Sequence, residues 1–188
     1  VEILDHFGPE AFRYFFLRHV PTLDDGDFTW ERFEAAYNGE LGNDLGNLVQ
    51  RVAAMTMRYQ AGVLSDIPPN RHDMGPYRAA LETFEFNRAL DEVWGIVRAL
   101  NQYLDRVKPW EVAKNRQTDV EAEAHLAEIL SHAAGTLLQV AELLVPFLPS
   151  TARAIQTIFA SGVIPADVQP LFPKIYLHTE DPRTTKQS

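Results

Sequence analysis

The 188-residue sequence contains no cysteine, and this absence excludes several kinds of protein. Without cysteine there are no disulfide staples, no zinc site with thiolate ligands and no cysteine nucleophile. A chain of this kind fits a reducing compartment, and we expect a cytoplasmic protein. No apolar stretch is long enough to cross a membrane, and the first residues lack the basic segment and cleavage site of a signal peptide. We therefore expect no membrane partner.

Sequence patterns of catalysis are also missing. Only residues 174–179 (KIYLHT) resemble a strand, and weakly, so no Gly-rich phosphate loop follows a strand. The six histidines are scattered without the carboxylate spacing of a metal site, and no serine has the setting of a nucleophile. We expect no catalytic residue, no cofactor and no metal in this chain.

The net charge of −9 argues against a broad electrostatic attraction to nucleic acid, and we expect no DNA partner. The charge is uneven, however, because residues 86–116 carry six Lys or Arg against four Asp or Glu. A polynucleotide would have to be bound locally, through shape and base contacts. The sequence also begins with Val1 and enters a helical pattern at once, so we expect a piece of a longer polypeptide.

Apolar residues recur at steps of three and four along most of the chain, the period of an amphipathic helix. Thr29 and Ser150 are predicted N-caps, and Pro109 is predicted to stop a helix. An apolar segment of the tail, within residues 168–188, is expected to lie on the bundle before the chain frays. The predicted fold is all-α, an antiparallel helix bundle. Its predicted helices span residues 9–20, 30–60, 75–83, 86–107, 119–145 and 150–160.

The stretch NDLGNLVQR, residues 43–51, contains more helix-opposing residues than packing requires. On a helical wheel with Asn43 at 0°, the apolar residues around it fall between about 80° and 200°, while Asn47 and Arg51 fall near 40° and about 80°. The amides and the guanidinium therefore form a ridge at the margin of the buried face, and such side chains can read a base edge. Alternatively, the amides bond to loop carbonyls and Arg51 pairs with Asp44. Gly42 and Gly46 lie on the other flank, where they would admit a neighbouring helix.

A second unusual stretch is LNQYLDRVKPWEVAK, residues 100–114. Trp110 follows the helix-stopping Pro109, with Lys108, Lys114 and Arg116 around it. An aromatic ring at a basic helix end can stack on an unpaired base. Alternatively, Trp110 closes the end of the core. Trp30 and Trp94 are expected to be core or cap residues.

The two stretches occur together in methionyl-tRNA synthetases. ELGNDLGNLVQR (40–51), followed by NQYLDRVKPWEVAK (101–114), closely resembles the anticodon-binding helical domain of that family. ILDHFGPEAFRYFFLR (3–18) resembles the helix that follows the lysine-rich loop of the catalytic domain in class I synthetases. DDGDFTWERF (24–33) and PLFPKI (170–175) resemble further stretches of the family. The resemblance covers residues 2–175.

In that family the bundle binds the anticodon loop of tRNA(Met). The resemblance implies that Asn47 and Arg51 recognise the first anticodon base, a cytosine, and that Trp110 stacks against it. Asn43 matches a motif asparagine that shapes the helix surface, and Lys108 belongs to the Lys-Pro-Trp corner. The implied partners are the tRNA(Met) anticodon loop and a catalytic domain N-terminal to Val1.

The chain departs from a complete synthetase in ways that limit its role. It has no nucleotide-binding signature, lysine-rich loop or zinc cysteines, so ATP and Mg²⁺ would be bound by the catalytic domain. The parent would be an ATP-dependent methionine-tRNA ligase, and this fragment alone would be inactive. We expect an anticodon-binding bundle over residues 1–175, with a connecting helix over 1–20, and a tail over 176–188. The alternatives are the same domain of an isoleucyl-, valyl-, leucyl- or cysteinyl-type synthetase, or a helical protein-interaction module without RNA binding.

Overall fold

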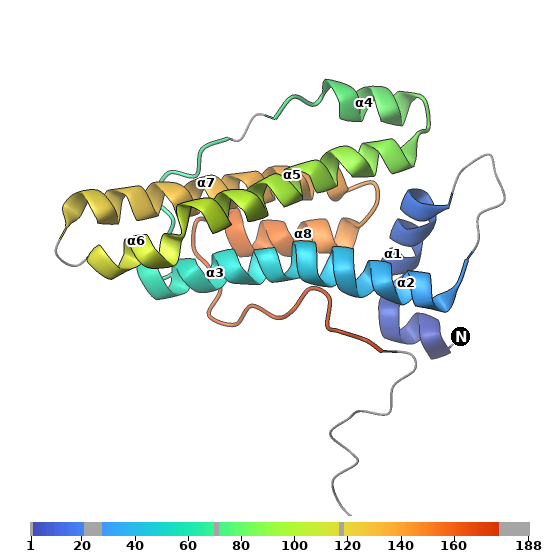
Figure 1. Ribbon diagram of the computed structural model, residues 1–188, viewed down its shortest axis with the longest axis horizontal. Helices are drawn as coiled ribbons and strands as arrows, with labels where there is room; N and C mark the ends of the chain where they lie inside the picture. The colour runs from blue at the N-terminus through green and yellow to red at the C-terminus, as the bar shows by residue number, and fades with distance from the viewer. Residues whose placement is uncertain (1, 21–27, 70–71, 117–118, 177–188) are drawn as a thin grey trace, which may run out of the picture.

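The computed structural model describes residues 2–20, 28–69, 72–116 and 119–176, and the side chains from Phe7 onward. Figure 1 shows helices joined by loops, so the predicted all-α class is confirmed. The elements are α1 (Glu2–His19), α2 (Trp30–Ala36), the π-helix η1 (Tyr37–Gly46), α3 (Asn47–Gln60), α4 (Gly75–Glu82), α5 (Phe86–Val107), α6 (Pro109–Asn115), α7 (Val120–Leu144) and α8 (Pro149–Phe159).

The long helices are stacked side by side, and α7 runs opposite to α3, α5 and α8 (Figure 1). The connection after α3 and the short α4 lead the chain back, so that α5 runs in the same direction as α3. This arrangement places the end of α3 beside the junction of α5 and α6. The two stretches singled out in the sequence meet where Arg51, in the first turns of α3, bonds to Asn101 and Asp105 of α5.

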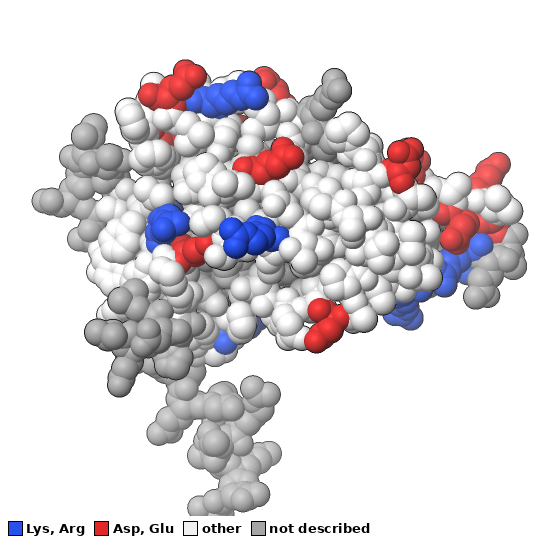
Figure 2. Space-filling view, turned by 180° about the vertical axis from the view of Figure 1, so that it is seen from behind, with Lys and Arg blue, Asp and Glu red and all other residues white. Residues whose placement is uncertain are grey.

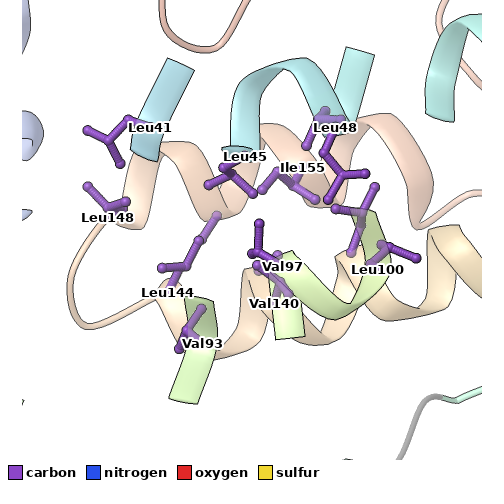
Figure 3. Close-up of a cluster of buried hydrophobic side chains, with 14 of the residues drawn as sticks. Leu41, Leu45, Leu48, Val93, Val97, Leu100, Val140, Leu144, Leu148 and Ile155 are labelled. Carbon is purple, nitrogen blue, oxygen red and sulfur yellow. The ribbon is translucent and has the colours of Figure 1, made fainter. Parts of the chain in front are cut away.

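The core lies between these helices, and Figure 3 shows a cluster of its leucine, isoleucine and valine side chains. The core also contains large aromatic side chains, among them Trp94, Phe33 and Phe147. The positions on the three long helices lie on the predicted apolar faces, whereas no such face was predicted for Leu148 or Ile155. Burial of one such side chain stabilises the fold by about 1.5–3 kcal/mol. The predicted bounds of the third long helix, residues 86–107, are those of α5. The labelled core residues are Leu41, Leu45, Leu48, Val93, Val97, Leu100, Val140, Leu144, Leu148 and Ile155, none more than 3% exposed.

The predicted helix over residues 30–60 is helical throughout but not α-helical throughout. Thr29 caps it as predicted, its hydroxyl accepting from the amide of Arg32 at 3.3 Å. Residues 37–46 then form η1, in which the amide of Asn47 bonds to the carbonyl of Gly42, five residues back. More residues fill each turn of such a helix than the 3.6 assumed for the wheel. The positions that the helical wheel gave to residues before Asn47 were therefore wrong. Asn43, Asn47 and Arg51 still follow one another in the ridge.

Gly42 and Gly46 face the C-terminal segment, and the predicted neighbouring helix is wrong. A Cβ on Gly46 would lie 3.1 Å from the carbonyl oxygen of Leu41 and 3.6 Å from the ring of Phe172. A Cβ on Gly42 would lie 3.7 Å from the carbonyl of Phe172. The contact with the Leu41 carbonyl is tight, so a side chain at Gly46 would press on the wide turn, whereas the contacts with Phe172 are of ordinary van der Waals length. The apolar part of the tail lies on the bundle as predicted, through Val168, Leu171, Phe172 and Ile175.

Two predicted helix starts differ from the structure. The first helix begins at Glu2 and is kinked at Gly8, where φ is 77° and ψ 158°, and only its second half was predicted. Ser150 is not an N-cap: α8 starts at Pro149, and Glu10 of α1 takes over the capping. The Glu10 carboxylate accepts from the amides of Ser150 at 2.6 Å and Thr151 at 3.2 Å. Residues 177–188, including the rest of the strand candidate, lie outside the described residues, and residues 174–176 form no strand.

Candidate nucleic-acid interface

Asn43 and Asn47 lie exposed at the junction of η1 and α3, one above the other. The Nδ2 group of Asn47 donates to Oδ1 of Asn43 at 3.3 Å. Neither side chain bonds to a loop carbonyl among the described residues, contrary to the alternative drawn from the sequence. The hydrogen bond between the two amides orients both side chains. Oδ1 of Asn47 is therefore left as an acceptor for a ligand, and Nδ2 of Asn43 is left as a donor.

Arg51, one turn further along α3, is held by two side chains of α5. Its Nη1 donates to Oδ1 of Asp105 at 3.0 Å, and its Nη2 donates to Oδ1 of Asn101 at 3.1 Å. The Nδ2 group of Asn101 in turn donates to the backbone carbonyl of Asp44 at 3.1 Å. The alternative ion pair of Arg51 with Asp44 is thus wrong, because Arg51 pairs with Asp105. The guanidinium is fixed in orientation while 34% of the side chain stays exposed.

The carboxylate of Asp44 makes no hydrogen bond or ion pair within the described part of the chain, and it is half-buried. Burial raises the pKa of Asp44, and the charge of Glu40 raises it further, while Arg98 and Arg18 act in the opposite direction. The interaction of this residue with the rest of the network is through its backbone carbonyl. Asp44 therefore supports the position of Asn101 and does not hold Arg51.

Lys108 joins α5 to α6 and sets up the corner at Trp110. It is in the left-handed region, with φ 48°, which favours glycine. Its amide bonds to the carbonyl of Leu104, which ends α5, and its own carbonyl accepts from the amide of Glu111 at 2.8 Å, which starts α6. Pro109 is the first residue of α6 and ends α5, as predicted. The Lys108 side chain is exposed, and no described residue pairs with it.

Trp110 is half-buried on α6 and packs against the edge of the core. It therefore closes part of the bundle and still exposes part of its ring, so the two uses proposed from the sequence are compatible. Trp94 is fully buried, and Trp30 packs against the core at the start of α2. Among the three tryptophans, Trp110 is the one at a helix end with basic neighbours.

A polar cluster behind η1 fixes this helix to α1. The carboxylate of Glu40 accepts from the hydroxyl of Tyr14, from Nε of Arg18 at 3.0 Å and from Nε2 of His19 at 3.0 Å. Burial alone would raise the pKa of Glu40, but the hydrogen bonds from His19 and Tyr14 and the charge of Arg18 hold it below its usual value. Burial, together with the charge of Glu40, raises the pKa of Tyr14. The cluster anchors the segment that carries the two asparagines.

The charged side chains form no broad basic face on the side that Figure 2 shows. Most of this surface is uncharged, and its blue groups lie next to red ones, including at the end where α6 lies. Among the described residues no group of three or more His, Asp or Glu could hold a metal ion, so the side chains present do not fit one. Within the same residues, no helix is long and apolar enough to span a membrane.

Asn101 and Asp105 are the residues that sequence reasoning missed. They lie one turn apart on the margin of α5, within the quoted stretch NQYLDRVKPWEVAK. A pair of polar residues at a spacing of four beside an apolar face was the available signal. Their partner could not be read from the sequence, because Arg51 lies 50 and 54 residues away from them.

The fold is found in solved methionyl-tRNA synthetases. The crystal structure of the free Mycobacterium tuberculosis enzyme matches with a TM-score of 0.82 and 22% identity, covering 93% of this chain and 40% of that one. The crystal structure of the same enzyme bound by methionyl-adenylate matches with a TM-score of 0.81. At this level of identity the likeness shows the fold alone, that of a helical domain of an aminoacyl-tRNA synthetase.

Sequence comparison assigns the particular family. The family described as the anticodon binding domain of methionyl tRNA ligase matches residues 59–171, and that described as class I tRNA synthetases (M) matches residues 1–53. The chain therefore belongs to the methionyl-tRNA ligase family, as its anticodon-binding part. The family decides against the first alternative drawn from the sequence, the same domain of another class I synthetase.

Two curated relatives show how much of the enzyme is present. The chain is 38% identical over 165 residues to the methionine–tRNA ligase of Streptomyces coelicolor, which covers 81% of this chain and 30% of the relative. It is 31% identical over 211 residues to methionine–tRNA ligase 1 of Bacillus cereus, which covers 96% of this chain and 31% of the relative. The chain thus spans about a third of the length of these enzymes.

Proposed function

We propose that this chain selects tRNA(Met), initiator and elongator alike, by binding the anticodon loop for a cytoplasmic methionine-tRNA ligase. The catalytic domain would lie N-terminal to Val1, bind ATP and Mg²⁺, and join methionine to the tRNA. The 188-residue chain would not catalyse that reaction. We assign residues 1–175 to the binding domain, with residues 1–20 as the connecting helix, and residues 176–188 to a tail.

The observation that carries this proposal is the fixed and accessible position of Arg51 beside Asn47. A cytosine presents acceptors at O2 and N3 and a donor at N4 on its pairing edge. The Nε–H group of Arg51 is buried, but the remaining N–H groups of its Nη1 and Nη2 atoms can donate to the acceptors, while Oδ1 of Asn47 can accept from N4. Uracil presents an acceptor, O4, in place of that donor, so Asn47 would then face a second acceptor. The pair would therefore prefer cytosine at the first anticodon position.

Because Asn101 and Asp105 already orient the guanidinium, binding would cost little further ordering of Arg51. Immobilising a free side chain of this length costs about 0.5–1.5 kcal/mol. Asn43 contributes by fixing the amide of Asn47 through their hydrogen bond. This arrangement supports a reading role for Asn47 and Arg51 and a positioning role for Asn43.

Trp110 supplies the stacking surface in this proposal, and Lys108 supplies a positive charge next to it. The ion pair of Arg51 with Asp105 lies in the last turns of α5, and Lys108 and Trp110 follow directly in the chain. Stacking of an unpaired base on an aromatic ring is worth about 1–3 kcal/mol. An acidic domain can bind RNA in this way because stacking and edge contacts do not need a broad positive surface.

The test is a titration of the 188-residue chain with an anticodon stem-loop RNA carrying C at the first anticodon position, and with the same RNA carrying U. We expect Trp110→Ala to weaken binding by about 1–3 kcal/mol, about 5- to 150-fold in Kd. Arg51→Ala should narrow the preference for C over U. Phe84→Ala is the matched control. Phe84 is an aromatic residue that is 69% exposed, and it precedes the start of α5, whereas Trp110 follows the end of that helix.

Three outcomes would contradict the proposal. Unchanged binding in Trp110→Ala, or an equal loss in Phe84→Ala, would remove the stacking role. An unfolded Trp110→Ala protein, seen by circular dichroism, would show that the ring serves mainly to close the core. If Arg51→Ala lowers the melting temperature strongly and leaves the preference for C intact, Arg51 is a structural residue, since an exposed ion pair contributes only about 0.2–1 kcal/mol.

A further inference from the structure

Arg58 continues the ridge of α3 beyond the residues discussed so far. It follows Arg51 by seven residues, which is two turns and about 10 Å along the same face of an α-helix. The side chain is exposed and makes no hydrogen bond or ion pair within the part of the chain that the structure describes. Arg51 and Arg58 thus share a face but differ in restraint, since two acceptors hold the first and none holds the second.

A second guanidinium lies near Arg58 at the ring of Tyr59. The Cζ atom of Arg58 is 5.6 Å from the centre of this ring, and the Cζ atom of Arg116 is 5.4 Å from it. No described carboxylate pairs with either arginine. Glu123 is the acidic side chain bonded to this end of α3, and its carboxylate accepts from the Nε2 group of Gln60 at 3.2 Å. The two arginines make this helix end locally positive in a chain of net charge −9.

Arg116 also removes an obstacle to anion binding at this place. The C-terminal end of a helix carries a partial negative charge on its free carbonyls, which would repel a phosphate. The Nη1 group of Arg116 donates to the carbonyl of Tyr59 in the last turn of α3, so the charge of the helix end is offset. An anion near Arg58 then meets two cations and a neutralised helix end.

The space beside Arg58 is open. A hollow of about 610 Å³ lies between α3 and the C-terminal segment, with Arg58 on its border and small side chains, Ala53 and Ala54, in its wall. Its acidic wall residue, Asp167, accepts from the side-chain amide of Gln169 at 2.6 Å. The hollow borders Arg58 and not Arg51, so it leaves room for a phosphate beside Arg58.

We propose that Arg58, supported by Arg116 at the Tyr59 ring, binds a backbone phosphate of the RNA next to the nucleotide read by Arg51. This inference rests on the proposed function and adds a contact that does not depend on the base. A phosphate is favoured over a base edge because reading an edge requires a guanidinium fixed by hydrogen bonds, and among the described residues that of Arg58 contacts only the face of the Tyr59 ring. A point contact with a phosphate does not require such restraint.

The test compares Arg58→Gln with Arg78→Gln in the 188-residue chain. Arg78 is an exposed arginine on α4 without a described partner, so both variants lose one positive charge. Each protein is titrated with the C and U stem-loop RNAs at several salt concentrations. For Arg58→Gln we expect the slope of log K against log salt to become shallower by about 0.7, the value for one contact with single-stranded nucleic acid. The loss should be equal for both RNAs, and Arg78→Gln should bind as the unmodified chain does.

The outcomes separate this inference from the function on which it rests. If the unmodified chain binds neither RNA, the proposed function and this contact fall together. If Trp110→Ala weakens binding while Arg58→Gln keeps the original slope, only the phosphate contact is refuted. A loss in Arg58→Gln that is larger for the C RNA than for the U RNA would show base reading, and would equally refute it. An equal loss of slope in Arg78→Gln would reduce the effect to net charge.

Discussion

Gly135 lies where α7 passes closest to the connection between α3 and α4, and its replacement by alanine gives a direct test of that packing. A Cβ at this position would lie 2.4 Å from the carbonyl oxygen of Pro68 and 3.5 Å from Cγ2 of Ile67. The first distance is far inside van der Waals contact, and the atom approached is backbone, so the connection would have to move. Overpacking of this kind costs about 1–3 kcal/mol.

Gly95, within α5, is the matched control, because a Cβ there meets nothing within 4 Å. Both substitutions gain the same helix propensity, about 0.5–1 kcal/mol. We therefore expect Gly95→Ala to be more stable than the unmodified chain. The difference between the two variants isolates the contact at Pro68 and should be about 1–3 kcal/mol, or about 2–12 °C in Tm for a chain of this size.

Urea denaturation of the two variants and the unmodified chain would measure this difference, provided that the slope m is the same for all three. Equal stabilisation by Gly135→Ala and Gly95→Ala would refute the reasoning, because the connection would then yield without cost. A lowered m in Gly135→Ala alone would show instead that the segment around Pro68 detaches, which is a different response to the same clash.

Two further predictions concern the anchoring of η1 and the corner at Lys108. Since the pKa of Glu40 is held below its usual 4.5, its carboxylate stabilises the fold above that pH, and the contribution is lost as the pH falls through the lowered pKa. Glu40→Gln should therefore be less stable than the unmodified chain by about 1.5–3 kcal/mol at neutral pH, the range for hydrogen bonds to a charged group. Urea denaturation should show this difference in the free energy of unfolding becoming smaller in acid. A difference that does not depend on pH would contradict the prediction. Lys108 has a left-handed backbone conformation, which costs a residue other than glycine about 1–2 kcal/mol. The melting temperature of Lys108→Gly should therefore rise, while its RNA binding should weaken. A rise without weaker binding would show that Lys108 is not part of the interface.

The bounds of α5 could be predicted because the signals that set them are local. Its apolar residues alternate steps of four and three, and Pro109 ends it. The π-helical turns of η1 could not be predicted, since apolar steps of four fit α- and π-helices alike. The segment packed against Gly46 includes Phe172, far along the chain. A local sequence pattern cannot indicate a neighbour that is so distant in the sequence.

The same limit explains the errors at Ser150 and Arg51. Serine is an ordinary N-cap, but the free amides of α8 are satisfied by Glu10, 140 residues away. The ridge of Asn47 and Arg51 was predicted correctly as a set of accessible side chains on one helix. The partners that orient it, Asn101 and Asp105, came into view only with the packing of α3 beside α5. What the ridge binds stays a prediction until RNA is titrated.

The two family patterns meet between residues 53 and 59, and both ends of this gap lie inside α3. The helix runs through the gap without interruption, with Val52 and Met55 in the core. From the other side, Glu10 caps α8, so the stretch with synthetase-type similarity completes the bundle of the anticodon-type stretch. The border between the two family matches is therefore not a boundary between two folding units. A joint engineered between this domain and another catalytic domain belongs before Glu10, close to the kink at Gly8. A protein beginning at residue 59 would lack the cap of α8 and all of α3 except its last two residues.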